Sequence, residues 1–279
     1  MYKSFISLIF LLFSSQLMGQ QAMVAEKSLH LKTGLFGTSY TGVFDNDGER
    51  KITPSVLHSG FYINAEAGIH KHWSVLVNAP LFIYNHVEAS SAPGGIEANT
   101  SISRPGDIEI GLKFGFSRND EWSACLAVVQ SLATGYRDKK TNLNTGFADF
   151  YTQSFFNVKY HRSTRWSAQT YMGFTNRNQY FGDEFMAGVS LNVLINENIL
   201  LEWNMNGVFP LENASEQPKL YLLGLYHNNR GLLNTGFEIT YMINGKVGVF
   251  TNGSFPIKGQ YFYSSPVAGL GLRMIFNKS

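Results

Sequence analysis

Residues 106–116 read Gly-Asp-Ile-Glu-Ile-Gly-Leu-Lys-Phe-Gly-Phe, a run in which apolar residues alternate with polar residues or glycine. Its even-numbered positions from 108 to 116 are all apolar, whereas the odd-numbered positions from 107 to 115 carry Asp, Glu, Lys or Gly. Since successive side chains of a β-strand point to opposite sides, the stretch is a strand with one apolar and one polar face. The same alternation recurs from about residue 28 to residue 276. Repeated strands with a lipid-facing exterior and a polar interior are typical of an outer-membrane β-barrel.

The N-terminus has the features of a secretion signal. Lys3 supplies the positive charge, residues 5–13 form a short apolar run, and Gly19 offers a small residue for cleavage. The apolar run is too short to cross a membrane as a helix. We therefore predict a signal peptide over 1–19 and one outer-membrane β-barrel domain over 20–279, in a Gram-negative bacterium. The short segment before the first predicted strand leaves no room for an N-terminal plug.

The composition narrows the function classes. Phe, Tyr and Trp make up 14% of the chain, as expected for aromatic girdles at two membrane interfaces. The formal charge of +2 gives no reason to expect a nucleic-acid partner. Cys125 is the only cysteine, which leaves no internal disulfide and no Cys-x-x-Cys motif. His70 and His72 lack an evident third ligand, so we expect neither a metal site nor another cofactor.

Connections of two lengths alternate along the chain. Short turns are predicted at 70–72, 117–120, 162–165, 196–198 and 244–245. Longer Gly-, Pro-, Ser- and Asn-rich segments are predicted at about 41–53, 85–105, 134–147, 177–181, 211–230 and 258–263. Outer-membrane barrels place short turns in the periplasm and long loops outside. Trp73, Trp122 and Trp166 each follow a short turn, where tryptophan would lie at the periplasmic interface.

The predicted fold is all-β: a transmembrane, antiparallel, up-and-down β-barrel of twelve strands. An even number is needed for both ends to lie in the periplasm, so segment 218–228, apolar on both faces, is interpreted as an extension or packed loop. Fourteen strands is the alternative, if a long loop hides another hairpin. Pro80, Pro210 and Pro256 are predicted near the outer ends of rising strands, because proline cannot donate to a strand ladder.

The last predicted strand runs from Pro266 to Phe276 and alternates apolar residues with Gly and Arg. A C-terminal strand that ends in an aromatic residue resembles the assembly signal of outer-membrane barrels. The resemblance implies the barrel-assembly machinery as a partner, in addition to outer-membrane lipid and small solutes.

The inward positions of the predicted strands carry nine charged residues that are candidates to line the lumen. These are Lys32, Glu66, Asp107, Glu109, Lys113, Lys159, Glu202, Glu238 and Arg273. In one interpretation they line a narrow aqueous path and select solutes. In the other they pair across the lumen and hold the barrel shut, because buried charges must pair or reach water.

Three features together resemble a known group of barrels. They are the strand at 106–114, the signal peptide, and rising strands that end in Ala-Pro-Leu, Phe-Pro-Leu or Phe-Pro-Ile. The group contains the outer-membrane proteins named for a phenol-degradation pathway and the hydrophobic-compound transporters related to fatty-acid porins. The resemblance implies a passive outer-membrane channel for small, hydrophobic or aromatic solutes.

Two other functions stay open. A barrel with a closed lumen could be structural or adhesive and present the segments at 85–105 and 134–147. A lipid-modifying hydrolase is the other, since His58-Ser59-Gly60 resembles the His-x-Ser-Asn-Gly motif of outer-membrane lipases. Adjacent strand residues point to opposite faces, so His58 could not readily activate Ser59, and we predict that the protein is not an enzyme.

Overall fold

The computed structural model describes residues 24–45, 47–89, 99–118, 121–136, 145–146, 150–161, 165–177, 182–211, 231–260 and 262–277. It describes the side chains of these residues except those of 53, 117, 118 and 262. The predicted signal peptide at 1–19 and the segment at 218–228 lie outside the described residues. The described residues contain no helix that is long and apolar enough to cross a membrane.

All regular structure in the described residues is β-strand. The strands are β1 (Ser28–Phe44), β2 (Arg50–His70), β3 (Trp73–Val87), β4 (Thr100–Arg104), β5 (Ile108–Arg118), β6 (Trp122–Leu132), β7 (Thr152–His161), β8 (Trp166–Asn176), β9 (Glu184–Leu194), β10 (Ile199–Pro210), β11 (Gly231–Met242), β12 (Val247–Gln260), β13 (Phe262–Tyr263) and β14 (Val267–Asn277).

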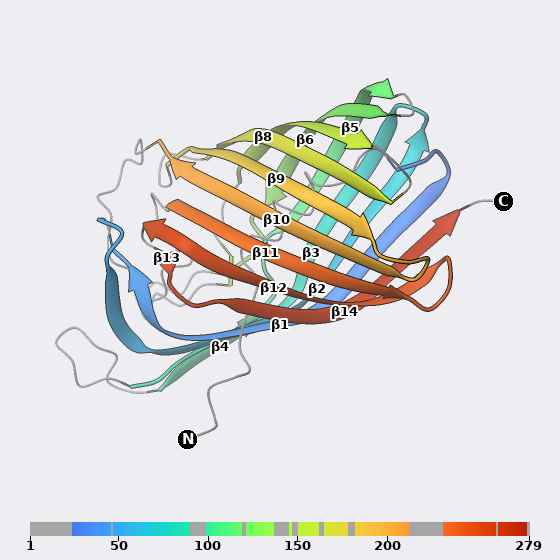
Figure 1. The fold of residues 1–279 in the computed structure, drawn as a ribbon. Helices are drawn as coiled ribbons and strands as arrows, with labels where there is room; N and C mark the ends of the chain where they lie inside the picture. The colour runs from blue at the N-terminus through green and yellow to red at the C-terminus, as the bar shows by residue number, and fades with distance from the viewer. Residues whose placement is uncertain are drawn as a thin grey trace.

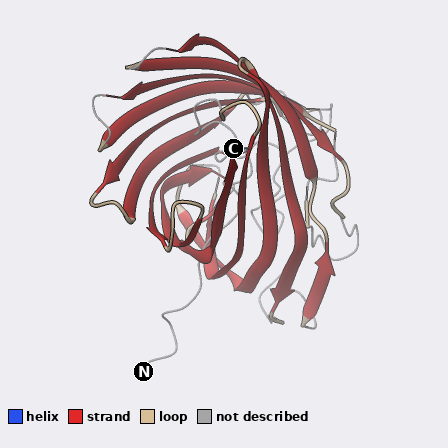
Figure 2. Cartoon of the chain, turned by 90° about the vertical axis from the view of Figure 1, so that its right-hand side faces the viewer, coloured by secondary structure: helices blue, strands red, loops and turns tan. Residues whose placement is uncertain are grey.

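Twelve of these strands form a closed antiparallel barrel, which confirms the predicted fold and strand count. Each strand pairs with the one before it and the one after it, in the order β1-β2-β3-β5-β6-β7-β8-β9-β10-β11-β12-β14. The pairing of β1 with both β2 and β14 closes the wall (Figures 1 and 2). The short turns and the end of β14 share one end of the barrel, called here the short-turn end; the opposite end is the loop end (Figure 1).

Two strands lie outside the closed wall, at the loop end. The pairing of β3 with β5 stops at Asn78↔Glu109, although β3 continues to Val87. Strand β4 pairs with this continuation, from Ile83↔Arg104 to Val87↔Thr100, and so satisfies backbone groups that would otherwise be left at an edge. The prediction of a plain loop at 85–105 was therefore wrong. In the segment at 258–263, β12 continues to Gln260 and β13 pairs with the end of β1.

Two of the prolines do not mark strand ends, contrary to prediction. Strand β3 continues past Pro80, and β12 continues past Pro256. A register shift follows Tyr62↔Pro80 in one ladder and Asn234↔Pro256 in the other. Proline fits inside these strands because a bulge locally interrupts the hydrogen-bond ladder. Pro210 is the last residue of β10, as predicted.

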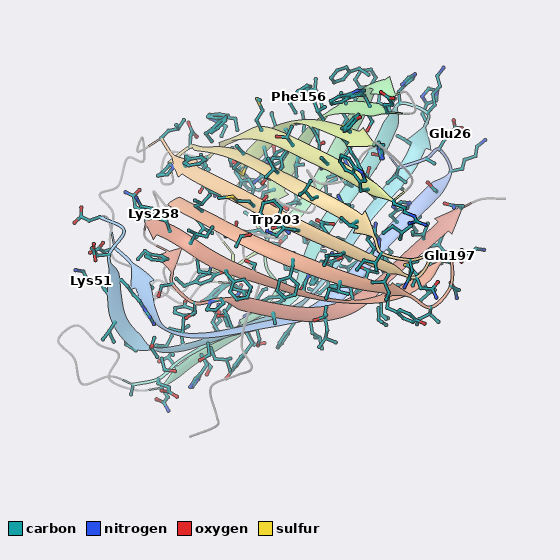
Figure 3. All side chains as sticks on the ribbon, viewed as in Figure 1. Glu26, Lys51, Phe156, Glu197, Trp203 and Lys258 are labelled. Carbon is teal, nitrogen blue, oxygen red and sulfur yellow. The ribbon has the colours of Figure 1, made fainter. Side chains whose placement is uncertain are left out.

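The outer face of the wall is apolar. Val128 and Leu270, at outward positions of β6 and β14, expose 52% and 62% of their surface. Figure 3 shows the dense layer of outward side chains, with Phe156 and Trp203 labelled. Such exposure of large apolar residues is what a lipid-facing surface requires.

Aromatic rings cluster on this face near the short-turn end. The ring centroids of Trp73 and Phe114 are 4.8 Å apart, and those of Trp122 and Tyr160 are 4.5 Å apart. Trp166 continues the cluster, with its ring centroid 6.0 Å from that of Tyr160. This arrangement matches the aromatic belt that marks a membrane–water interface.

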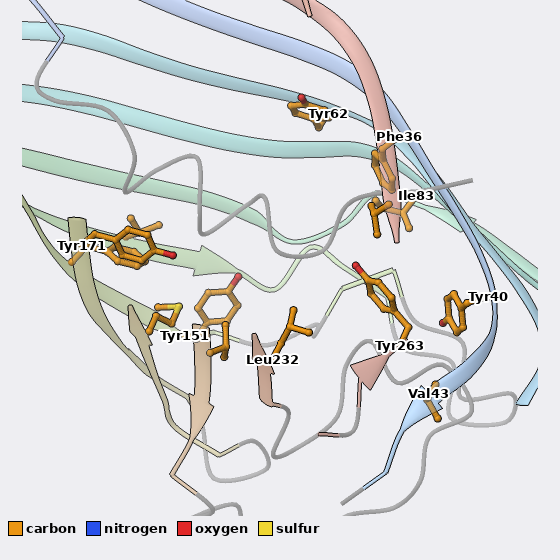
Figure 4. Close-up of a cluster of buried hydrophobic side chains, with 14 of the residues drawn as sticks. Phe36, Tyr40, Val43, Tyr62, Ile83, Tyr151, Tyr171, Leu232 and Tyr263 are labelled. Carbon is orange, nitrogen blue, oxygen red and sulfur yellow. The ribbon is translucent and has the colours of Figure 1, made fainter. Parts of the chain in front are cut away.

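The apolar core lies inside the barrel, mainly between its middle and the loop end. It contains Phe36, Tyr40, Tyr62, Tyr151 and Tyr171, which come from the inner faces of several strands and one loop (Figure 4). The expectation of an interior that is polar throughout was therefore wrong for this part of the barrel.

Candidate functional site

The candidate site is the lumen, whose inner face has two zones. A band of charged side chains encircles the lumen toward the short-turn end. The aromatic core lies toward the loop end. Seven of the nine charged residues singled out in the sequence belong to the band: Lys32, Glu66, Lys113, Lys159, Glu202, Glu238 and Arg273. Asp107 and Glu109 lie nearer the loop end.

Two ion pairs in the band join strands across intervening ones. Lys32 Nζ on β1 lies 2.5 Å from Glu238 Oε2 on β11, and Asn252 Nδ2 donates to the same oxygen over 3.3 Å. The ammonium group of Lys32 also lies 4.4 Å from the ring centroid of Phe250. The Lys32 charge is thus balanced by a carboxylate and an aromatic face.

The second pair lies on the adjoining part of the wall, since β2, which carries Glu66, pairs with β1, which carries Lys32. Lys113 Nζ on β5 donates to Glu66 Oε2 on β2 over 2.8 Å, and Ser74 Oγ donates to Glu66 Oε1 over 2.6 Å. The side chains of Lys113 and Glu66 are only 1% and 9% exposed. Both carboxylate oxygens are therefore hydrogen-bonded, as a buried charge requires.

Lys159, Glu202 and Arg273 complete the band and differ from the paired residues. Each occupies an inward position of its strand, and each is partly exposed. None of the three forms an ion pair or a hydrogen bond with another described side chain. They interact electrostatically over longer distances. The charges of Lys159 and Arg273 both act on Glu202, and the charge of Arg273 also acts on Lys159.

Glu202 and Glu238 are direct partners in the ladder between β10 and β11. Like charges placed opposite one another in a sheet repel. Lys32 relieves this repulsion at Glu238 through the ion pair, whereas Glu202, a half-buried residue, has no ion-pair partner among the described residues.

Asp107 and Glu109 accept hydrogen bonds from other parts of the chain toward the loop end. Asp107 precedes β5 and accepts a 2.7 Å hydrogen bond from the Gly135 backbone N–H. Glu109 is 1% exposed and accepts hydrogen bonds from Asn78 Nδ2 (2.8 Å) and Tyr151 OH (2.5 Å). Asp107 therefore fastens a loop, and Glu109 is enclosed by neighbouring groups.

Sequence reasoning missed a buried ion pair in this region. Arg177 Nη2 donates to Glu184 Oε2 over 3.0 Å, and the two side chains are 1% and 3% exposed. The Arg177 guanidinium lies 4.8 Å from the ring centroid of Tyr151, which links the pair to Glu109. Glu184 could have been found from the alternation of β9, whereas Arg177 follows the end of β8 in a predicted loop and had no such signal.

The inward aromatic rings lie against glycines on adjacent strands. In the ladders, Phe155 is opposite Gly173 and Phe250 is opposite Gly271. A Cβ at Gly271 would lie 2.7 Å from the Phe250 ring. The same relationship links Tyr62 to Gly34, Phe36 to Gly60 and Tyr171 to Gly188. Glycine on the lumen face therefore gives space for large rings that lie flat against the wall.

The histidines considered in the sequence have ordinary surroundings. His58 is buried inside the barrel and contacts Asn85 Oδ1 through Nδ1, whereas Ser59 occupies the opposite face of β2. The rings of His70 and His72 lie 6.0 Å apart in an exposed turn. Among the described residues, no group of three or more His, Cys, Asp or Glu residues could hold a metal ion.

Comparison with known proteins defines the fold. No family model matches the chain, and no curated protein matches it in sequence. An outer-membrane channel from Pseudomonas putida F1 matches in structure with a TM-score of 0.67 and 10% identity, covering 92% of this chain and 97% of that one.

The NanC porin matches with a TM-score of 0.55 and 5% identity, over 88% of this chain and 98% of that one. The KdgM porin, solved in complex with disordered oligogalacturonate, matches with a TM-score of 0.51 and 4% identity, over 88% and 99%. The chain therefore has the porin-like fold of outer-membrane channels.

Proposed function

We propose that the protein is a passive channel for small solutes in the outer membrane of a Gram-negative bacterium. The observation that carries this proposal is the set of inward charges at Lys159, Glu202 and Arg273, which are half-buried and have no ion-pair partner among the described residues. An ionised side chain without a close partner is stable only where water reaches it, since an unpaired buried charge costs several kcal/mol. Ions can cross this part of the lumen only if it contains water, so these charges favour a conducting path.

The aromatic core supports hydrophobic or aromatic solutes as the cargo. Phe36, Tyr62 and Tyr171 project into the interior of the barrel, where their rings are buried among one another and their neighbours (Figure 4). Ring surface favours contact with apolar and aromatic solutes. The resemblance of the 106–114 strand to hydrophobic-compound transporters points the same way, and we extend that resemblance to the function of this chain.

The direct test is electrical. The mature protein, refolded and shown to be folded by its heat-modifiable electrophoretic mobility, is inserted into a planar lipid bilayer. Discrete and reproducible current steps support the channel. A folded barrel that inserts without conductance contradicts it.

A second candidate function is structural or adhesive. The observation that favours it is the extension of the β1–β2 hairpin, whose ladder runs to Phe44↔Arg50, whereas β3 pairs with β2 only as far as Val56↔Val87 (left in Figure 1). Settling of aggregated bacteria that produce the full chain is compared with settling of bacteria that produce variants trimmed at the β1–β2 hairpin, at 85–105 or at 134–147. Loss of aggregation on trimming, without conductance in the intact protein, favours adhesion.

We also propose that the barrel is not an enzyme. Supporting observations are the opposite faces of His58 and Ser59 on β2 and the channel-like fold. Hydrolysis of phospholipid vesicles by the pure protein, abolished by Ser59→Ala, would contradict this proposal.

A further inference from the structure

Lys159 and Arg273 project into the lumen from opposite walls of the barrel. We propose that they form an anion-selective constriction that favours small solutes with a carboxylate and an apolar body. This inference rests on the proposed channel function and adds the charge class of the solute.

The strand order places the two cations opposite each other. From β7, which carries Lys159, to β14, which carries Arg273, the wall runs β7-β8-β9-β10-β11-β12-β14. In the other direction it runs β7-β6-β5-β3-β2-β1-β14. Both routes take six steps, so the two strands are half a circumference apart in the twelve-strand wall. A solute that passes this level therefore passes between the two cations.

The two cations are also close enough to affect each other. Arg273 and Glu202 both act electrostatically on Lys159, and both cations act on Glu202. Glu202 lies on β10, three steps from each of them along the wall. One carboxylate placed between two cations leaves their mutual repulsion only partly relieved, and an anion in the lumen would relieve the rest.

The remaining charges of the band do not reverse the excess of positive charge contributed by Lys159 and Arg273. Lys32 is paired with Glu238, and Lys113 is paired with Glu66. Another titratable group near the band, His30, is affected electrostatically by Arg273, Glu66 and Lys113. With the two pairs neutral, the unpaired groups are two cations and one carboxylate, so the accessible charge among the described residues of this band is positive. A positive constriction lowers the barrier to anions and raises it to cations.

The side chains next to the band indicate what the solute carries besides its carboxylate. The ring of Phe250 lies next to Lys32 and against Gly271, which is two residues before Arg273 on β14. The aromatic core begins here and continues toward the loop end. A molecule with a carboxylate at one end and a ring at the other would place each end against matching groups. Benzoate is the simplest probe of this class.

The first experiment measures ion selectivity from the reversal potential in a KCl gradient across the bilayer. We expect chloride to be more permeant than potassium in the parent protein. Lys159→Gln and Arg273→Gln should each lower the chloride-to-potassium permeability ratio, and the double variant should reverse the preference. Glu202→Gln should raise the ratio.

A matched control removes a positive charge outside the lumen. Lys246 lies in the exposed turn between β11 and β12, so Lys246→Gln should leave the permeability ratio unchanged. A parent channel that prefers potassium, or lumen variants that behave like Lys246→Gln, would overturn the inference while leaving the channel function in place.

The second experiment adds benzoate or benzylammonium at the loop side and records the KCl current. Benzoate should bind in the constriction and reduce the current in a voltage-dependent way, and this block should be lost in the double variant. Benzylammonium, which has the same ring and the opposite charge, should not block. Equal block by both probes, or none by benzoate, would overturn the solute class. Absence of any conductance would instead contradict the proposed channel function, and the inference about the solute would fail with it.

Discussion

Phe155 lies directly opposite Gly173 in the ladder between β7 and β8, and its ring covers that glycine on the lumen face. A Cβ at Gly173 would overlap the ring and lie 2.9 Å from the Ser154 carbonyl oxygen. The ring is buried among the aromatic core, and the backbone oxygen is fixed by the sheet. The position of the Phe155 ring therefore requires a glycine at 173 in the barrel wall.

Gly173→Ala should destabilise the barrel. The added methyl forces the Phe155 ring or the β7 backbone to move, and overpacking of this kind costs about 1–3 kcal/mol. The urea midpoint of refolded protein in detergent or vesicles, followed by heat-modifiable mobility, measures the effect. Gly245→Ala is the matched control, because a Cβ at Gly245 meets nothing within 4 Å. Equal midpoints for the two variants would argue against the packing described here.

Glu66→Gln should also destabilise the barrel, by a different mechanism. It leaves the Lys113 ammonium, whose side chain is 1% exposed, without its carboxylate, and breaking a buried pair costs about 3–5 kcal/mol. Adding Lys113→Met should recover part of the loss, because it removes the uncompensated charge. For comparison, Lys51→Met breaks an ion pair with Asp45 in which Lys51 is 60% exposed, and should cost only about 0–1 kcal/mol. If the double variant is less stable than Glu66→Gln, the pair does not act as described.

Val128→Lys tests the lipid-facing surface. Val128 is 52% exposed at an outward position of β6, and a lysine on the lipid face near the bilayer centre costs about 2–4 kcal/mol. Folding into vesicles should therefore become slower and less complete. Ile52→Lys is the control, since Ile52 is 90% exposed near the end of the β1–β2 hairpin. A normal folding yield for Val128→Lys would mean that this face does not contact lipid.

Asp107→Ala should release the loop that Asp107 fastens. The variant loses the acceptor for the Gly135 N–H, while Asp107→Asn retains an oxygen that can accept the same hydrogen bond. Limited proteolysis of the refolded protein should cut Asp107→Ala near residues 133–136 faster than the parent or Asp107→Asn. Equal cleavage of all three would show that the hydrogen bond does not restrain this segment.

The sequence alone was sufficient for the architecture. The alternation in 106–116 correctly assigned lipid-facing and inward residues in β5, because a two-residue period follows directly from strand geometry. The same period placed Glu202 and Arg273 at inward positions. Alternating turn lengths predicted the up-and-down order, and the requirement for an even number of strands led to the count of twelve.

The pairing of charges and the inward position of the aromatic residues could not be predicted from strand alternation. Lys32 and Glu238 are 206 residues apart in the chain, and nothing local to either one selects the other. Phe36 and Tyr62 are aromatic yet face inward, a choice that depends on Gly60 and Gly34 across the ladder. Strand β4 was not predicted, because it pairs with the part of β3 that extends beyond the ladder between β3 and β5.

Single-channel recording of the refolded mature protein in a planar bilayer shows whether the lumen conducts. We predict discrete, reproducible current steps whose ion selectivity changes when Lys159 or Arg273 is replaced by Gln. A folded, membrane-inserted barrel that carries no current would mean that the lumen is closed and that Lys159, Glu202 and Arg273 do not lie on an open aqueous path.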